Sequence, residues 1–434
     1  MIATTIVSVL TFVALTSSIL FFPTIRIGKR KIGAYWGIAL IGAFLLLCLH
    51  LTPLSEIRNG LTKDAEINPL KILVLFFSMT FLSVYLDEVG FFRLLASKAT
   101  KRAGENQLRL FVILYLLTAV LTVFTSNDII ILTLTPFICF FCKNTKISPL
   151  PYLVSEFAVA NTWSMMLIIG NPTNIYLATS ASLGFVEYIG VMALPTITAG
   201  IVEFILIFLL FRKQLGARIE PEPDDFKIKS KSDLIVGIIH LAICLVFLVI
   251  SEYVGIPMWL VSAICALSLL ICAVLLRLVK KDGGSYIKKS LVRLPWQLIP
   301  FVLSMFVIVI CLGDQGVSQK LGSLLGNRAC VWTYGASSFL FANLINNIPM
   351  SILFSTLPTD LAPAQYSQAI YASIAGSNIG AFLTPIGALA GIMFTELTER
   401  YQVKYGFRQF LKYGAIISIP TFAATLAVLS LILQ

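Results

Sequence analysis

Four clusters of polar residues, glycine and proline interrupt long apolar stretches of this chain. Two are short runs between apolar arms, Thr125–Asp128 and Asn346–Pro349, and two are glycine-containing breaks, Gly170–Asn174 and Asn378–Gly387. Amide side chains both donate and accept hydrogen bonds, so these clusters can bind an oxyanion, a neutral hydroxylated solute or a partly hydrated cation. Asp128 adds a carboxylate that can bind a cation or take up a proton.

The elements that position these clusters must lie in a membrane. Of the 434 residues, 58% are apolar and only 12% are charged, and the mean hydropathy is +0.92. Apolar runs near or above ~18 residues recur, which is the length that crosses a bilayer as a helix. The alternating segments of a β-barrel are absent from the sequence. We therefore predict an all-α polytopic protein of the cell membrane.

A polar break inside such a helix is informative because an unsatisfied backbone group in hydrocarbon costs several kcal/mol. Breaks persist only where protein buries them or where they line a wet cavity. In secondary transporters, discontinuous helices of this kind form the substrate and ion sites.

The apolar segments predict two halves with the same order of elements, namely three spans, a re-entrant helical hairpin, a broken span and a closing span. The first half is 1–211, with a hairpin at about 108–142 and a broken helix at 151–178. A charged cytoplasmic linker, 212–233, separates it from the second half, 234–434, with a hairpin at about 331–357 and a broken helix at 369–397. This second broken helix is predicted to be interrupted twice, at Gly376–Gly380 and at Thr384–Gly387.

The distribution of positive charge sets the orientation. One set of loops holds 27 of the 32 lysines and arginines, and this set comprises 23–31, 92–109, 142–149, 212–233, 277–293 and 400–412. Because cytoplasmic loops carry the excess of Lys and Arg, this side is predicted to be cytoplasmic and both termini external. The first hairpin then opens to the cytoplasm and the second to the outside. The net charge of +11 is explained by this bias, and no basic cluster predicts nucleic-acid binding.

An internal repeat agrees with this inverted arrangement. Asn161 and Gly170 recur as Asn378 and Gly387, each 217 residues later, and the tip residue Asn127 recurs as Asn347. Inverted repeats with paired broken helices indicate a secondary transporter whose site lies near the bilayer midplane.

We predict that the two tips and the two breaks converge on one site. Its predicted residues are Ser126, Asn127, Asp128, Asn161, Gly170, Asn171, Thr173, Asn174, Asn346, Asn347, Ser377, Asn378, Thr384 and Gly387. Helix N-termini after each tip or break favour an anion, whereas unwound carbonyls favour a cation such as Na⁺. No cofactor or resident metal is predicted. A purely structural capping role is the alternative for Asp128 and the asparagines.

We predict different roles for four other acidic residues. Glu156 and Glu203 lie inside apolar spans and are secondary candidates for carrying a proton. Asp87 and Glu88 lie at a span end, where we expect them to be solvated.

These motifs resemble those of the ion transporter superfamily, which includes arsenite efflux permeases, sodium/dicarboxylate and citrate symporters, and NhaD-type sodium/proton antiporters. The matching pieces are Ser126-Asn127-Asp128, Gly170-Asn171-Pro172-Thr173-Asn174, Asn346-Asn347-Ile348-Pro349-Met350, Gly376-Ser377-Asn378-Ile379-Gly380 and Leu383-Thr384-Pro385-Ile386-Gly387. The resemblance implies an elevator-type homodimer in which a mobile transport domain contains both hairpins and both broken helices.

Within the superfamily, the tips are most similar to those of the arsenite permeases. Dicarboxylate carriers typically have Ser-Asn-Thr at both tips, whereas this chain has Ser126-Asn127-Asp128 and Asn346-Asn347-Ile348. The resemblance therefore implies a small inorganic solute, with proton-coupled export of arsenite or antimonite as the expected function. A sodium/proton antiporter and a sodium-coupled organic anion symporter remain open.

Other classes of protein and partner are less well supported. An intramembrane enzyme is disfavoured because the sequence has no His-Glu-x-x-His or Gly-x-Ser-x-Gly motif. The expected partners are the solute, H⁺ or Na⁺ as coupling ion, the lipid bilayer and a second copy of the chain. An ATPase partner is not indicated by the sequence.

Overall fold

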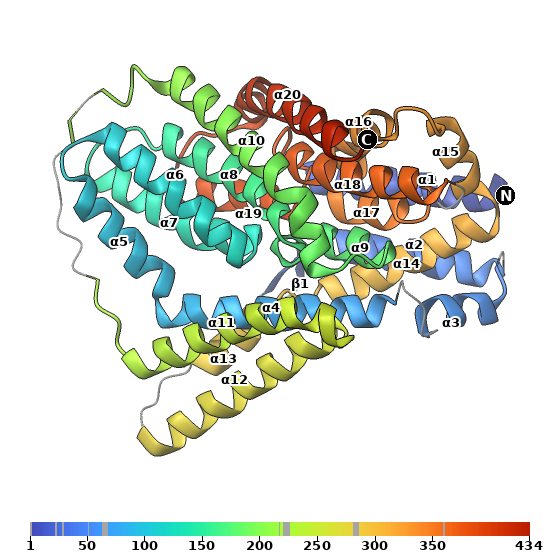
Figure 1. Cartoon of the computed structure of the whole chain (residues 1–434), viewed down its shortest axis with the longest axis horizontal. Helices are drawn as coiled ribbons and strands as arrows, with labels where there is room; N and C mark the ends of the chain where they lie inside the picture. Colours follow the sequence, from blue (N-terminus) through green and yellow to red (C-terminus); the bar gives the residue numbers. More distant parts are fainter. Residues whose placement is uncertain are drawn as a thin grey trace.

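The computed structural model describes residues 2–21, 24–27, 30–50, 52–62, 68–216, 218–219, 226–280, 286–358 and 361–434. Helices account for nearly all of the regular structure in these residues (Figure 1). The exception lies in the first basic loop, where β1 (Thr24–Ile27) pairs antiparallel with β2 (Arg30–Gly33). The expectation of an all-α fold therefore holds for the apolar helices and is wrong for this short two-stranded β-hairpin.

The two halves have the same order of helices. The first half contains α1 (Ile2–Phe21), α2 (Tyr35–Cys48), α3 (Leu54–Thr62), α4 (Pro69–Val89), α5 (Phe91–Ala103), α6 (Gln107–Phe124), α7 (Asn127–Asn144), α8 (Leu150–Trp163), α9 (Pro172–Ser180) and α10 (Phe185–Phe211). The second half contains α11 (Lys231–Val254), α12 (Met258–Lys280), α13 (Tyr286–Arg293), α14 (Leu298–Asp314), α15 (Val317–Leu325), α16 (Cys330–Ile345), α17 (Asn347–Phe354), α18 (Pro363–Gly380), α19 (Leu389–Arg400) and α20 (Phe407–Ile432).

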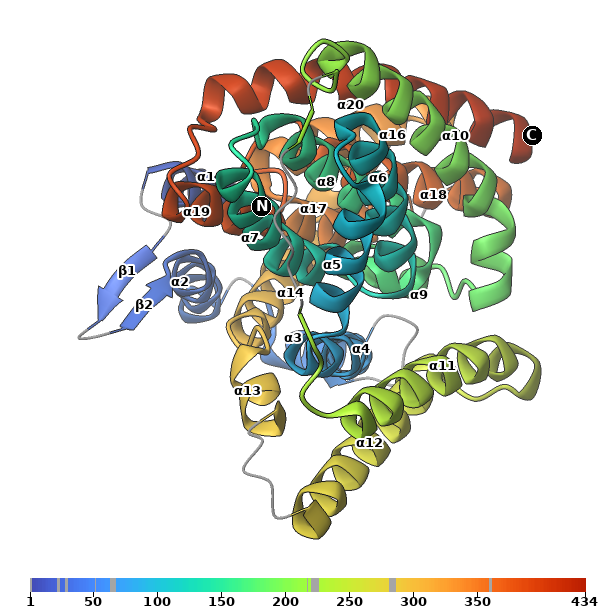
Figure 2. The same ribbon diagram turned by 90° about the vertical axis from the view of Figure 1, so that its left-hand side faces the viewer.

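Eight helical segments in the described residues are long and apolar enough to cross a membrane, and three shorter apolar helices accompany them. In α11 and α12, large apolar side chains such as Val246 and Leu267 are more than half exposed. Apolar exposure of this extent is stable only where lipid or another protein covers it. Figure 2 shows α11 and α12 projecting away from the other helices.

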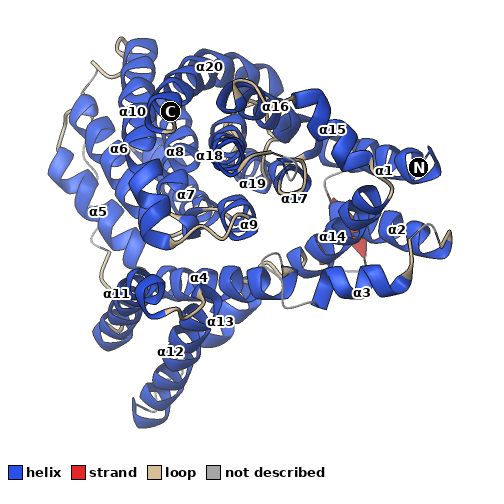
Figure 3. Ribbon diagram, turned by 45° about the vertical axis from the view of Figure 1, so that its right-hand side comes forward, coloured by secondary structure: helices blue, strands red, loops and turns tan. Residues whose placement is uncertain are grey.

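The helices form two bodies. The hairpin bundle comprises α6–α10 and α16–α20, and the flanking bundle comprises α1–α4 and α11–α14 (Figures 1 and 3). Contacts between the bundles are made by α4 with α7 and α9, by α10 with α11, by α14 with α17, and by α1 with α16. The hairpin bundle contains all four polar clusters.

The surroundings of Asp87 and Glu88, at the end of α4, differ from the expectation that both residues are solvated. Asp87 and Glu88 are not solvated, because Arg293 of α13 contacts Asp87 Oδ2 at 2.7 Å and Glu88 Oε1 at 2.6 Å. Thr133 of α7 donates a hydrogen bond to Asp87 Oδ1 at 2.8 Å. These acids therefore tie α4 to α13 within the flanking bundle and to the first hairpin.

The arms of the first hairpin reach the length of candidate membrane spans, whereas one arm of the second hairpin is much shorter. The arms α6 and α7 have 18 residues each, which at 1.5 Å per residue is about 27 Å. In the second hairpin α17 has only 8 residues. The turns fall where predicted, at Thr125–Ser126 and at Asn346.

The breaks differ in position from the expected ones. The first begins earlier, at Ser164, and contains two 3₁₀ turns, η1 (Ser164–Met166) and η2 (Ile168–Gly170), before α9. In the second half the predicted interruption at Gly376–Gly380 is wrong, because α18 runs unbroken to Gly380. Only the later stretch, 381–388, separates α18 from α19. Gly376 and Gly380 instead permit close helix packing, as described below.

Candidate functional site

Asn378, near the end of α18, is the centre of a buried polar network. Its Oδ1 accepts hydrogen bonds from Ser164 Oγ and Asn171 Nδ2, both at 2.9 Å. Its Nδ2 donates to Asn174 Oδ1 at 2.7 Å and to the carbonyl of Ile374 at 2.8 Å. The helix of the second half therefore crosses the break of the first half, and one amide side chain joins residues more than 200 positions apart.

The first break has a local cause. Asn171 is in an extended conformation and its side chain accepts the N–H of Thr173 at 3.2 Å, so it caps α9. Pro172 occupies the first turn of α9, where its missing N–H is not needed. Asn174 then donates to the carbonyls of Ser164 and Leu167, at 2.8 and 3.0 Å. The amides thus satisfy carbonyls that the broken helix leaves free.

The first hairpin tip contacts α8. Asn127 Nδ2 donates to Asn161 Oδ1 at 3.1 Å, and Asn127 Oδ1 accepts the backbone N–H of Asp128 at 2.9 Å. The N-cap residue Ser126 makes no side-chain cap here, and within α7 no donor bonds the Asp128 carboxylate. Asp128 is half-buried and close enough to Tyr35 of α2 for an electrostatic interaction. The expected acid thus faces the boundary with the flanking bundle.

The second hairpin tip contacts the second break. Asn346 Nδ2 donates to the Ile386 carbonyl at 2.8 Å, and the backbone N–H of Asn347 donates to the Gly387 carbonyl at 3.0 Å. Asn346 has a φ of 74°, a conformation that costs a non-glycine residue about 1–3 kcal/mol and is found at ligand sites and switch regions. Thr384 Oγ1 donates to Asn343 Oδ1 at 2.7 Å.

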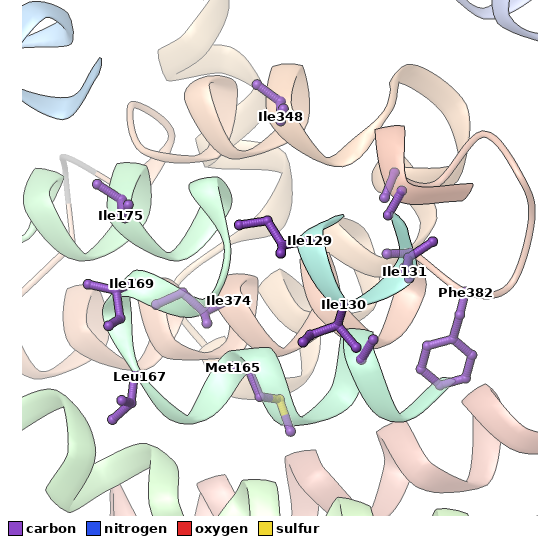
Figure 4. Close-up of a cluster of buried hydrophobic side chains, with 14 of the residues drawn as sticks. Ile129, Ile130, Ile131, Met165, Leu167, Ile169, Ile175, Ile348, Ile374 and Phe382 are labelled. Carbon is purple, nitrogen blue, oxygen red and sulfur yellow. The ribbon is translucent and has the colours of Figure 1, made fainter. Parts of the chain in front are cut away.

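An apolar shell encloses these groups. Figure 4 shows Ile129–Ile131 after the first tip and Ile348 after the second, with Met165, Leu167 and Ile169 along the first break. All of these side chains are buried. Exclusion of water strengthens each hydrogen bond and raises the cost of leaving a donor or acceptor without a partner.

The structure brings the predicted residues into two contacting groups. The break residues Asn171, Thr173 and Asn174 join Ser377 and Asn378, with Ser377 Oγ donating to Thr173 Oγ1 at 3.0 Å. The tips contact Asn161 and Gly387 as described above. Gly170 closes the second 3₁₀ turn, and a Cβ there would meet the backbone of Ser164. Ser126 is buried beside the tip without capping its helix.

Two residues of the network were not predicted from the sequence. Ser164 bonds Asn378, and Asn343 donates to the carbonyls of Phe339 and Gly380, both at 2.9 Å. Asn343 is three residues before the second tip and is a polar residue within an apolar arm. This pattern could have predicted that Asn343 belongs to the network. Ser164 gave none, because single serines are common in apolar helices.

Chemically, the clusters offer amides, hydroxyls, backbone groups and one acid. None of the four clusters contains lysine, arginine or histidine. Within the described residues, no group of three or more His, Cys, Asp or Glu side chains is placed to hold a metal ion. The arrangement suits a small uncharged or weakly charged solute that both donates and accepts hydrogen bonds.

Comparison with known proteins identifies the family. The model of a family described as citrate transporter (CitMHS) matches residues 30–376. The chain belongs to the citrate transporter family. The match spans both hairpins and the first break of this family member, and the resemblance to the ion transporter superfamily is confirmed.

Individual relatives of this citrate transporter family member cover its length. An arsenical pump membrane protein from Escherichia coli is 29% identical over 424 residues, which are 93% of this chain and 94% of that protein. A putative arsenical pump membrane protein from Bacillus subtilis is 26% identical over 428 residues, 90% of this chain and 93% of that one. The chain is a membrane transporter and a multi-pass integral membrane protein, as predicted.

A solved structure has the same fold. The crystal structure of the Alcanivorax borkumensis YdaH transporter aligns with a TM-score of 0.54 over 99% of this chain and 97% of that one, at 17% sequence identity. At this identity the likeness concerns the fold alone.

Proposed function

We propose that this protein exports arsenite or antimonite and that the export is coupled to protons. The observation that carries the proposal is the absence of cationic side chains from the four polar clusters, which instead present asparagine amides, hydroxyls and Asp128. The names of the E. coli and B. subtilis relatives support it.

The chemistry of the solute fits such a site. Trivalent arsenic in neutral water is As(OH)₃, an uncharged molecule whose three hydroxyl groups donate and accept hydrogen bonds. Asparagine amides and unwound backbone can pair with these hydroxyls without burying a charge. A citrate ion, by contrast, would bring several negative charges to a site without a positively charged partner.

Asp128 is our proposed proton carrier. Its carboxylate lies at the first tip, adjacent to Asn127 and facing α2, so its ionisation state can respond to movement between the two bundles. A carboxyl within a membrane-spanning region is costly when ionised and is therefore suited to binding and releasing a proton.

We further propose that the halves have inverted topology and that the hairpin bundle moves as the transport domain against the flanking bundle, in a homodimer. A cavity of 380 Å³ between the bundles supports such a boundary. Its lining includes Lys71 and Trp259 from the flanking bundle and Thr179 and Phe185 from the hairpin bundle.

Solute flux into proteoliposomes tests the function. Arsenite, antimonite, sodium, phosphate and citrate are supplied in turn under an imposed proton gradient and then under a sodium gradient. We expect metalloid accumulation that collapses when the proton gradient is dissipated. Citrate uptake driven by sodium, or sodium exchange for protons without metalloid flux, would contradict the proposal and favour one of the alternative transporter classes.

A further inference from the structure

Glu203, in the middle of α10, is a fully buried carboxylic acid outside the four clusters. Its side chain is 0% exposed, and neither carboxylate oxygen has a hydrogen-bond partner. An ionised carboxylate without a partner in a dry interior is highly unfavourable, so in this conformation the group must be neutral.

Two unused donors lie next to this acid. The Thr162 hydroxyl adjoins the Glu203 carboxylate, and the Trp163 indole N–H adjoins the Tyr115 hydroxyl, but neither donor is aligned for a full hydrogen bond in this conformation. The Trp163 ring packs on Gly200, one turn before Glu203 on the same face of α10, where an added Cβ would lie 2.8 Å from the indole nitrogen. Small rotations of these side chains would bring two donors to the carboxylate once it became ionised.

The surroundings argue for a proton and against a metal cation. Donors such as Thr162 and Trp163 favour the ionised carboxylate, whereas Na⁺ needs several oxygen acceptors. Tyr115 of α6 is close enough to Glu203 for an electrostatic interaction, and its hydroxyl donates to the Gly200 carbonyl at 2.6 Å. From α20, Tyr413 lies against Phe211, two turns away on α10.

The remaining elements against α10 bring no counter-charge to Glu203. Asp233 of α11 is bonded to the Tyr85 hydroxyl, and α8 with η1 has no titratable residue after Glu156. The Glu156 carboxylate is itself occupied by the Thr135 hydroxyl at 2.9 Å. On α20, Arg408 and Lys412 are exposed, and Lys412 lies over the Tyr413 ring at the Phe211 end of α10. Among the described residues, no ionised side chain therefore pairs with Glu203.

A closing helix of this kind can pack without an acidic residue at the position of Glu203. When α10 and α20 are aligned from their first residues, the position equivalent to Glu203 is Thr425. The Thr425 hydroxyl donates to the Thr421 carbonyl of its own helix at 2.8 Å. The second half thus fills the equivalent buried position with a small neutral side chain.

The neighbours of the two donors connect Glu203 to the site. Residues 162 and 163 lie directly between Asn161, which bonds the first tip, and Ser164, which bonds Asn378. We propose that Glu203 is a proton-binding site of the transport cycle. Its carboxyl group holds a proton in this conformation. When the proton is released, the carboxylate attracts the Thr162 hydroxyl and the Trp163 N–H, and the first break shifts with these two residues. This inference rests on the proposed proton coupling.

The test compares Glu203→Gln with Glu187→Gln, an exposed glutamate in the first turn of the same helix. Glutamine has the size and neutrality of protonated glutamate, so E203Q should fold with an unchanged melting temperature. Infrared spectra of the purified proteins during a pH titration should show a protonated-carboxyl C=O band that is present in the wild type and E187Q and absent from E203Q. Unfolded E203Q, or a band that E203Q retains unchanged, would overturn the proposal.

Transport supplies the second readout. E203Q should retain exchange of metalloid between equal concentrations on both sides, while proton-driven accumulation and the accompanying proton flux are lost. Wild-type proton coupling in E203Q would refute the role of Glu203. A wild-type protein that moves no metalloid would refute the proposed function instead, and the infrared titration would still decide whether Glu203 binds the proton.

Discussion

Asp128 is the acidic residue of the four polar clusters, and it lies near the flanking bundle. Its own hairpin does not use its carboxylate as a cap, and its backbone N–H is accepted by the Asn127 side chain. The acid instead faces Tyr35 of the flanking bundle. If the proposed movement between the bundles takes place, the solvation of this group changes during the cycle, which is the condition for coupling proton binding to transport.

Replacing Asp128 by Asn should abolish proton-driven accumulation without loss of folding. The amide keeps the size of the side chain but cannot release a proton. Flux in proteoliposomes measures the effect, and size-exclusion chromatography monitors folding. Gradient-driven transport at the wild-type rate in D128N would show that the proton is carried elsewhere.

Asn378 has a different role, since it connects segments that are far apart in the sequence. Replacing it by Ala would leave Ser164, Asn171 and Asn174 without their shared partner. Each buried polar group left unpaired costs about 1–3 kcal/mol, so the melting temperature in detergent should fall clearly.

Ser373→Ala is the matched control for that change. Ser373 lies on the same helix, is equally buried and makes one hydrogen bond, to the Ala369 carbonyl at 2.7 Å. Loss of this single bond should cost only about 1 kcal/mol. If N378A were no less stable than S373A, the network would not hold the breaks together.

At the scale of elements, α18 packs on α16 through small residues. Gly376 and Gly380 lie one turn apart on α18, and a Cβ on Gly376 would approach the Gly335 carbonyl at 2.7 Å and the Phe339 nitrogen at 2.8 Å. A Cβ on Gly380 would lie 2.9 Å from the Phe339 carbonyl. Small residues spaced by four allow membrane helices to approach this closely.

Gly376→Ala should therefore destabilise the second hairpin although alanine is the better helix former. Forcing a methyl group into a filled interface costs about 1–3 kcal/mol. Gly190→Ala on α10 is the control, because a Cβ there meets nothing within 4 Å, and it should be neutral or stabilising. Thermal unfolding of both variants measures the difference, and equal melting temperatures would argue against tight packing of α16 on α18.

At the scale of the whole molecule, the central question is whether the halves are inverted in the membrane. The shared order of helices supports a repeat, and the charge of the loops predicts that α7 ends in the cytoplasm and that α16 begins outside. The exposed residues Asn144 and Asn327 mark these two positions.

Single cysteines at Asn144 and Asn327 should react with a membrane-impermeant maleimide from opposite sides of the membrane. Intact cells should label N327C only, whereas everted vesicles should label N144C only. The exposed Cys48 must first be replaced by Ser, because the other described cysteines are buried or half-buried. Labelling of both positions from one side would exclude the inverted arrangement.

The sequence by itself determined the class and the linear plan of this protein. Hydropathy, the positive charge of the loops and the placement of glycine and proline are local properties, and they predicted a polytopic helical protein, both hairpin turns and a break in the helix before α9. The same local signals misled at Gly376–Gly380, where glycine serves close packing and not a break. They also misled at Asp87 and Glu88, whose cationic partner Arg293 is about 200 residues away.

Only the tertiary structure decided which polar groups meet. It joined Asn378 to Ser164, Asn171 and Asn174, and it left Glu203 without a partner beside two unused donors. Such pairings depend on how helices cross after the chain has been buried in lipid. The free energy of burying a polar group depends on the hydrogen-bond partner that a neighbouring helix supplies. The order of residues along the chain does not show which partner that is.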